Sequence, residues 1–269
     1  MAVDTLRVAT LNIWNRFGPW EQRLVAIEKG LRDLEPDLVG LQEVLRLAPG
    51  EGDALDQASL FGKTLGHHVA YGRSREERWY GNAALSRWPI LESRVFELPR
   101  SGTDEKRSLL YSEIDAPFAR VPFFVTHLNW RFEHGHVREQ QVREIALVVR
   151  SLAPATSFPA ILVGDFNAEP EADEIRYLRG LTSLGTGHRA FYQDAFGLAG
   201  DGPGYTYARR NPFAAPLREP DRRIDYVFVR GRDDRFRGEP LEARVCFDGP
   251  VAGTYPSDHF GVVADLRVG

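Results

Sequence analysis

The sequence contains a single cysteine, Cys246, among 269 residues. One thiol excludes an intramolecular disulfide and a zinc site built from several cysteines, and it favours a reducing compartment. The sequence also lacks a run of eighteen or more apolar residues, so no membrane-spanning helix is expected. Its first residues lack the charged and apolar regions of a secretory signal. We therefore expect a cytoplasmic protein without a transmembrane segment.

The sequence also lacks a large excess of either charge, because it has 34 basic and 38 acidic side chains and a net charge of −4. No run rich in Lys or Arg is present, so the totals do not indicate a general electrostatic grip on duplex DNA, although a local basic face stays open. Low-complexity linkers and repeats are absent too. The composition is that of an ordinary globular protein. We expect one domain over residues 1–269, acting as a monomer.

Apolar patterning predicts more strands than helices. Alternating or continuous apolar runs predict strands at 6–12, 37–43, 67–71, 82–86, 92–98, 109–115, 122–127, 160–167, 224–229, 241–247 and 259–266. Apolar residues at helical spacing predict helices at 24–34, 58–65, 138–152 and 171–181. Residues 48–57, 99–107 and 198–221 are expected to be loops. Each half carries strand–helix–strand units and hairpins, which predicts an α/β fold of two packed sheets covered by helices.

The most informative segment is 160–170, where an aliphatic run breaks at Gly164 into Asp165 and Asn167. On extended backbone these two side chains would point the same way, because strand side chains repeat every second residue. A carboxylate and a carboxamide side by side can hold a water and a phosphoryl oxygen. The structural alternative is a turn, rich in Asp and Asn, that only closes a strand.

Other predicted strands also deliver an acid, an amide or an imidazole at or beside one end. The set is Asn12, Glu43, His127, Asp165 with Asn167, Asp225, and Asp258 with His259. A cap, a salt bridge or a core histidine would explain each one singly, but their recurrence indicates a shared polar edge. Glu43, Asp258 and the Asn12 amide oxygen are hard ligands suited to Mg²⁺ or Mn²⁺. The two histidines can carry acid–base chemistry, and Asp225 is a candidate to orient His259.

Seven segments in this order resemble the endonuclease/exonuclease/phosphatase superfamily, which has the deoxyribonuclease I-like fold. They are Thr10-Leu11-Asn12, Leu41-Gln42-Glu43, Gly81-Asn82-Ala83-Ala84-Leu85-Ser86-Arg87, Thr126-His127-Leu128, Gly164-Asp165-Phe166-Asn167, Arg223-Ile224-Asp225-Tyr226-Val227 and Ser257-Asp258-His259. The resemblance spans nearly the whole chain. It implies a four-layer α/β sandwich, in which two packed mixed β-sheets are flanked by helices.

The resemblance also implies roles for the shared residues. Asn12 and Glu43 match metal-site residues, and Asp258 matches a further metal-associated carboxylate. His259, paired with Asp225, matches the histidine that activates the attacking water. His127 matches a second histidine that bonds the phosphate or assists the leaving group. Asp165 and Asn167 match the pair that positions the nucleophile and contacts the scissile phosphate.

Two departures from the family pattern disfavour repair of abasic sites. That branch has an acidic residue where this chain has Trp14, and a tyrosine where it has His127. In deoxyribonuclease I an upstream glutamate supports the second histidine. Glu76 or Glu77 could fill that place here, and the role stays unassigned.

These residues predict a Mg²⁺- or Mn²⁺-dependent phosphoesterase. The favoured form is a phosphodiesterase for a small-molecule or lipid-headgroup substrate, in which water activated by His259 and Asp225 attacks in line. The alternative is a DNA or RNA endonuclease that uses arginines as phosphate contacts, namely Arg209, Arg210, Arg222 and Arg223. An inositol phosphatase is less favoured because that branch's extra basic motifs are not found. A scaffold without catalysis is disfavoured because every catalytic position holds a competent side chain.

Substrate contacts are predicted mainly in the loop that follows His127. They comprise Asn82, Trp130, Arg131, His134 and His136. His134 and His136 could instead form a second metal site, and the loop could also be only a solvated surface segment. Trp14 and Trp20 are candidates for an aromatic wall beside Asn12, with helix packing as the favoured alternative for Trp20.

Overall fold

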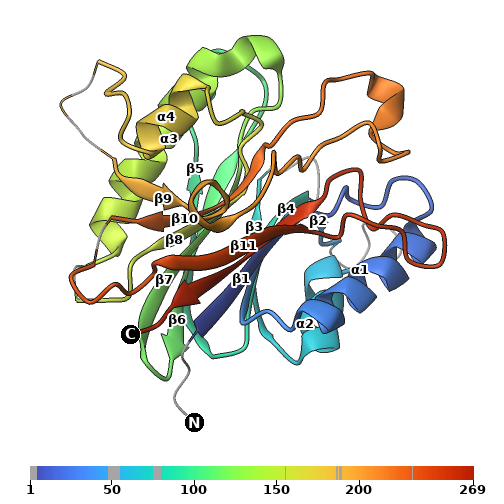
Figure 1. The fold of residues 1–269 in the computed structure, drawn as a ribbon, viewed down its shortest axis with the longest axis horizontal. Helices are drawn as coiled ribbons and strands as arrows, with labels where there is room; N and C mark the ends of the chain where they lie inside the picture. The colour runs from blue at the N-terminus through green and yellow to red at the C-terminus, as the bar shows by residue number, and fades with distance from the viewer. Residues whose placement is uncertain are drawn as a thin grey trace.

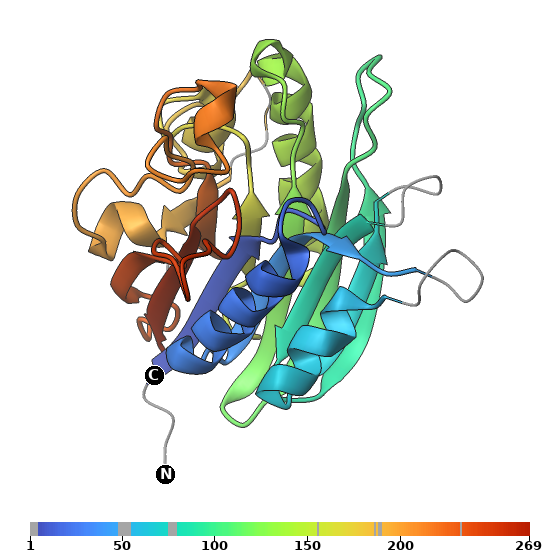
Figure 2. The same cartoon turned by 90° about the vertical axis from the view of Figure 1, so that its right-hand side faces the viewer.

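A computed structural model describes residues 5–47, 55–74, 80–154, 156–185, 187, 190–231 and 233–269. Two mixed six-stranded sheets pack face to face (Figures 1 and 2). The first sheet has the order β11 (Pro240–Cys246), β12 (Gly261–Arg267), β1 (Thr5–Asn12), β2 (Leu38–Leu45), β4 (Tyr80–Ser86) and β3 (His68–Arg73). The second has the order β5 (Ile90–Glu97), β6 (Ser108–Ala116), β7 (Ala119–His127), β8 (Ile161–Asp165), β10 (Asp225–Arg230) and β9 (Tyr192–Asp194).

Helices cover the outer faces of both sheets, so the expected four-layer α/β sandwich is confirmed (Figure 2). Helices α1 (Trp20–Leu34) and α2 (Gln57–Leu65) lie on the first sheet, and α3 (Gly135–Leu152) and α4 (Asp173–Leu178) lie on the second. Shorter elements are α5 (Ala195–Ala199) and the 3₁₀ turns η1 (Phe132–His134) and η2 (Ala215–Leu217). Among the described helices, none is both long and apolar enough to cross a membrane.

The core between the sheets is made by strand residues that the apolar runs supply. Val125 of β7, Val163 of β8 and Val227 of β10 are fully buried in one cluster with residues of the first sheet. Burial on both faces explains why β8 reads as a continuous apolar run instead of an alternating one. Gly164 lets β8 approach β7 closely, because a Cβ there would lie 2.0 Å from the carbonyl oxygen of Thr126.

Most predicted elements are confirmed, and the errors lie at short elements and boundaries. The predicted strand 160–167 ends at Asp165, and the predicted helix 171–181 is formed only over Asp173–Leu178. Strand β9 and helix α5 were not predicted, since each is five residues or fewer and has no full period to recognise. His259 precedes β12 instead of lying in it. Of the predicted loop 48–57, residues 48–54 lie outside the described part of the chain.

Candidate active site

Three predicted catalytic residues lie in one row at an edge of the second sheet. Strands β7 and β8 run parallel and end at His127 and Asp165, which are register partners. Strand β10 runs antiparallel to β8 and begins at Asp225, which is the partner of Asp165 on the other side. Two strand ends and one strand start therefore place an imidazole and two carboxylates side by side.

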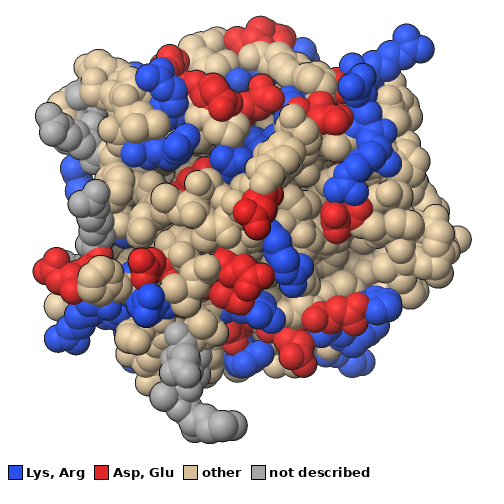
Figure 3. All heavy atoms as spheres, viewed as in Figure 1, with Lys and Arg blue, Asp and Glu red and all other residues tan. Residues whose placement is uncertain are grey.

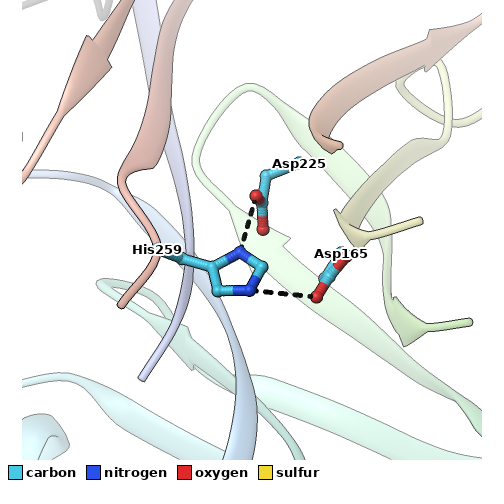
Figure 4. A group of neighbouring side chains, drawn as sticks. All are labelled: Asp165, Asp225 and His259. Atoms are coloured by element: carbon cyan, nitrogen blue, oxygen red, sulfur yellow. Dashed lines mark hydrogen bonds and ion pairs between the residues drawn. The ribbon is translucent and has the colours of Figure 1, made fainter. Parts of the chain in front are cut away.

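His259 reaches this row from the segment before β12 and lies between the carboxylates of Asp225 and Asp165 (Figure 4). Its Nδ1 lies 3.0 Å from Oδ2 of Asp225, and its Nε2 lies 3.7 Å from Oδ2 of Asp165. All three side chains are buried. Burial opposes the charged imidazolium, but the carboxylates of Asp225 and Asp165 outweigh it and raise the pKa of His259 to about 10. The predicted pairing of His259 with Asp225 is thus present in the structure.

The Oδ2 atom of Asp165 is the point where four site residues meet. Besides His259, it accepts a hydrogen bond of 3.1 Å from Nδ2 of Asn12 and lies 3.3 Å from Nε2 of His127. Burial, Arg107 and His259 together hold the pKa of His127 well below its usual range. The pKa values of the two histidines are therefore shifted in opposite directions, which makes the imidazole of His259 the stronger base of the two.

Glu43 lies near the end of β2 in the first sheet, next to Asn12. The register of β2 against β4 shifts between Leu41 and Val44, and Glu43 within this bulge has the left-handed backbone φ of 57°. A bulge of this kind re-aims a side chain, here toward Asn12, whose Nδ2 lies 3.3 Å from Oε1 of Glu43. Burial and repulsion from Asp258 raise the pKa of Glu43 to about 7.

The donor set fits a hard divalent cation. Glu43, Asp165 and Asp258 line one cavity, and burial raises the pKa of both Glu43 and Asp258. When the charged form of a carboxylate is disfavoured in this way, its surroundings lack a compensating positive charge, which Mg²⁺ or Mn²⁺ would supply. The Nδ2 atom of Asn12 faces Glu43 and Asp165, while its Oδ1 accepts the Trp14 N–H at 3.0 Å. Asn12 could therefore act as an oxygen ligand only with its amide turned over.

A second possible metal group comprises Asp165, Asp225 and His259, whose ligand atoms lie within 4.8 Å of one another. Each ring nitrogen of His259 already faces a different carboxylate, since Nδ1 faces Asp225 and Nε2 faces Asp165. An imidazole between two carboxylates is the arrangement of an oriented general base. This group is therefore suited to acid–base chemistry as well as to a metal, and Glu43 and Asp258 are separate candidates to hold a cation.

Asn167 reaches the cavity by a turn instead of by the extended backbone expected from the sequence. Strand β8 ends at Asp165, whose Oδ1 accepts the Asn167 backbone N–H at 2.9 Å, and Asn167 has a positive φ of 51°. This is the turn that was the structural alternative for the motif. Its amide Nδ2 donates to the Leu128 carbonyl at 3.1 Å. The turn and the functional pair coexist, because both side chains still line the cavity.

These side chains surround a cavity of about 620 Å³ with a partly aromatic wall. Besides the polar residues, its lining includes Trp14, Phe17, Tyr80, Trp130, Tyr207 and Leu217. Trp14 thus lines the cavity, in agreement with the predicted aromatic wall beside Asn12. Trp20 instead lies at the start of α1 and packs against its apolar cluster, as the alternative proposed.

Two buried arginines line the cavity, and the sequence pattern singles out only Arg222, as a candidate phosphate contact. Arg107, immediately before β6, is 4% exposed and hydrogen-bonds Glu105, while its Nε has no protein partner. The sequence pattern predicts Arg107 at the end of an exposed loop, and only the apolar strand that follows it indicates burial. Arg222 is 6% exposed and hydrogen-bonds Glu219. It had been considered only as one of several nuclease phosphate contacts.

Thr206 is another residue that the sequence did not single out. Its Oγ1 accepts the backbone N–H groups of Ile224 at 3.1 Å and Asp225 at 3.2 Å, and its carbonyl accepts the Phe260 N–H at 2.6 Å. Thr206 therefore ties the segment that carries Asp225 to the segment that carries His259. Next to it, the ring of Tyr207 lies 5.0 Å edge-on from that of His259.

The predicted substrate residues divide between the cavity and other places. Trp130 lines the main cavity, and Arg131 and His134 line a smaller adjoining one. Asn82 is 1% exposed and donates to the carbonyls of Ser108 and Val125, so it joins the sheets. His136 lines neither cavity, and the described residues supply no third ligand to a metal site with His134.

The remaining basic candidates lie outside the cavity. Arg209 and Arg210 are exposed and pair with Asp221 and Asp248, and Arg223 is buried against Asp194. Glu76 and Glu77, considered as supports for the second histidine, lie outside the described residues.

Comparisons with known proteins agree with this geometry. Protein angel from Drosophila melanogaster is 29% identical over 196 residues, which are 63% of this chain and 50% of that protein. The chain spans half or less of the length of the curated relatives it matches. The crystal structure of an endonuclease/exonuclease/phosphatase from Bacteroides vulgatus matches with a TM-score of 0.76 at 20% identity, covering 98% of each chain. That of humanized D. rerio TDP2 matches with a TM-score of 0.74 at 19% identity, covering 98% of this chain and 100% of that one.

A family model extends the similarity to the segments that carry the site. The model of the Endonuclease/Exonuclease/phosphatase family matches residues 9–259, a range that includes Asn12 at one end and His259 at the other. The chain belongs to the endonuclease/exonuclease/phosphatase family.

Proposed function

We propose that this protein is a divalent-metal-dependent phosphodiesterase that breaks a P–O ester bond by in-line attack of water. The observation that carries the proposal is the His259 imidazole between Asp225 and Asp165, because His259 and Asp165 lie on the wall of a cavity that Glu43 and Asp258 also line. One imidazole held between two carboxylates, beside a site for a hard cation, is a suitable arrangement for phosphoester hydrolysis.

His259 takes the proton of the attacking water. Asp225 faces Nδ1 and fixes the ring orientation, which leaves Nε2 as the proton acceptor. The gap of 3.7 Å between Nε2 and Oδ2 of Asp165 is too long for a direct hydrogen bond, but it accommodates a water that both atoms contact. As the water oxygen bonds to phosphorus, its proton passes to Nε2 of the neutral His259 imidazole, and the ester oxygen leaves with the electrons of the broken P–O bond as an alkoxide or phenoxide.

Neighbouring groups hold the phosphate and balance its charge. A cation held by Glu43 and Asp258, Mg²⁺ or Mn²⁺, supplies charge neutralisation at the phosphoryl oxygens when bound. The neutral imidazole of His127 and the guanidinium of Arg107, both on the cavity wall, offer hydrogen bonds to the same oxygens. Asn167 lines the cavity beside them and completes the polar wall.

Hydrolysis of bis-p-nitrophenyl phosphate, with and without Mg²⁺ or Mn²⁺, tests the proposal. We expect metal-dependent release of p-nitrophenolate and slower release from the monoester p-nitrophenyl phosphate. Plasmid DNA and RNA in the same panel test the endonuclease alternative, for which Arg222 on the cavity wall is the supporting observation. Failure to hydrolyse any of these esters with either metal would favour a scaffold.

A further inference from the structure

We propose that the cavity selects a phosphodiester with a single phosphate whose uncleaved ester group is a planar aromatic ring, which packs against Trp14 and Trp130. This inference rests on the proposed phosphodiesterase activity and names the class of its substrate. It is carried by two features of the cavity, namely an aromatic wall that is fixed in advance and a set of cations that are already neutralised by carboxylates.

Trp14 is held in place as a rigid aromatic surface two residues after Asn12. It has the left-handed φ of 53°, which is uncommon for a bulky residue and persists where the surroundings impose it. Its ring packs 5.1 Å from that of Phe213 and 6.0 Å from that of Phe17, and the fully buried guanidinium of Arg23 lies 4.8 Å from its centroid. A ligand that stacks on this ring loses little to reordering the protein.

Apolar side chains on the cavity wall are left open to solvent. Trp130 is 51% exposed, Phe17 is 57% exposed and Leu217 is 63% exposed, although all three line the same cavity. They come from three different loops, so no single amphipathic element explains their exposure. Convergent exposed apolar groups beside a few placed polar groups are the mark of a site for an apolar ligand group.

The charges of the cavity argue against a polyanionic ligand. Its two arginines, Arg107 and Arg222, each hydrogen-bond a glutamate that lines the same cavity. Three further carboxylates, those of Glu43, Asp165 and Asp258, also face it. Even with a divalent cation bound, these groups together carry no excess of positive charge, which disfavours a ligand with more than one phosphate.

On the face of the described residues that Figure 3 shows, no stripe of basic side chains compensates for the carboxylates of the cavity. There, Lys and Arg side chains are interspersed with Asp and Glu. Arg209 and Arg210, which a nuclease could use against a nucleic-acid backbone, are paired with Asp221 and Asp248. Binding to a polynucleotide would instead require several cations free to contact phosphates.

The activity test compares two diesters with the same charge and the same p-nitrophenolate leaving group. Methyl p-nitrophenyl phosphate and 2-naphthyl p-nitrophenyl phosphate differ only in the second ester group. We expect kcat/KM to be about tenfold higher for the naphthyl ester, as an aromatic contact of ordinary strength gives. Trp14→Ala and Trp130→Ala should each reduce this preference severalfold. Phe236→Ala is the matched control, since this aromatic is 65% exposed and follows the far end of β10.

Equal kcat/KM for the two esters would overturn the inference and leave the phosphodiesterase intact. Hydrolysis of neither ester would overturn the proposed function itself. A higher kcat/KM for a single-stranded octanucleotide than for the naphthyl ester would overturn the single-phosphate class in favour of a nuclease.

A binding measurement keeps the inference testable without turnover. Isothermal titration calorimetry compares diphenyl phosphate with dimethyl phosphate, two monoanionic diesters, with and without Mg²⁺. We expect diphenyl phosphate to bind about tenfold more tightly and to lose this advantage in Trp14→Ala and in Trp130→Ala. Equal affinities in the unsubstituted protein, or an advantage that survives both substitutions, would contradict the proposed aromatic contact.

Discussion

The Nε2 atom of His259 lies 3.7 Å from Oδ2 of Asp165, on the edge of the ring opposite to the one that faces Asp225. The imidazole is therefore held at Nδ1 by Asp225, while its Nε2 faces the carboxylate of Asp165 without a direct hydrogen bond. A water between these two groups would be oriented by Asp165 while His259 removes its proton. This relationship links the two sheet edges, since Asp165 also accepts from Asn12 of the first sheet.

Thr206 is expected to act as a positioning residue for the catalytic pair. Thr206→Val keeps the side-chain shape but removes the acceptor for two buried N–H groups, at a cost of roughly 1–3 kcal/mol for each. Burial raises the pKa of Asp225 and the Thr206 hydroxyl opposes this rise, so the variant should raise that pKa further and shift the acid limb of the kcat profile to higher pH. Thr206→Ser should restore both properties. A loss of stability with an unchanged pH profile would show a purely structural role.

Glu43 is expected to make the metal-free protein less stable as pH rises. Its pKa is about 7 in the folded protein against an ordinary 4.5, so between these values the folded state binds more protons than the unfolded state. The free energy of unfolding should therefore fall across this range relative to Glu43→Gln. Added Mg²⁺ should raise Tm more at pH 8 than at pH 5, and Glu43→Gln should reduce that increase. Thermal denaturation of both proteins checks this, and equal pH slopes would contradict it.

Arg107, which lines the cavity, is expected to bind the substrate phosphate through its guanidinium group. A hydrogen bond to a charged group contributes about 1.5–3 kcal/mol, so Arg107→Ala should raise KM for bis-p-nitrophenyl phosphate roughly tenfold or more. Arg107→Lys should give a smaller rise, because it keeps the charge but loses the planar donor set. Arg94→Ala is the control, since this arginine pairs with Glu92 on exposed β5. An unchanged KM in Arg107→Ala would contradict the assignment.

Cys246 is expected to be chemically inert in the folded protein. It is 3% exposed, and burial raises the pKa of its thiol far above the ordinary value, so little thiolate forms. Iodoacetamide at pH 8 should modify it only in denaturant, with mass spectrometry as the readout. Fast modification under native conditions would show that the segment around β11 opens readily.

The sequence predicted the fold and the meeting of the strand ends because both follow from local patterns. The apolar run before Asp165 and the polar side chain at its end are properties of neighbouring residues, and the chain needs only the right sheet order to bring such ends together. Asp225 is instructive, since it lies at a strand start. Its strand runs antiparallel to β8, so a start and an end share the same edge.

The parts that were not predicted depend on contacts far along the chain. Arg107 and Arg222 belong to loops without periodicity, and their burial follows only from how those loops fold over the cavity. Thr206 stands out only when its partners 18 and 19 residues later are known. The left-handed backbone of Glu43 and of Asn167 is likewise imposed by a bulge and a turn. Neither residue type signals that conformation strongly.

The most direct measurement of the central claim is kcat of His259→Ala on bis-p-nitrophenyl phosphate in Mg²⁺. Because His259 is the proton acceptor held by Asp225, we predict a fall of roughly 10²–10⁴-fold with circular dichroism unchanged. His68→Ala, at an exposed position of β3, should retain the activity of the unsubstituted protein. A His259→Ala protein that turns over like the unsubstituted protein would contradict the account.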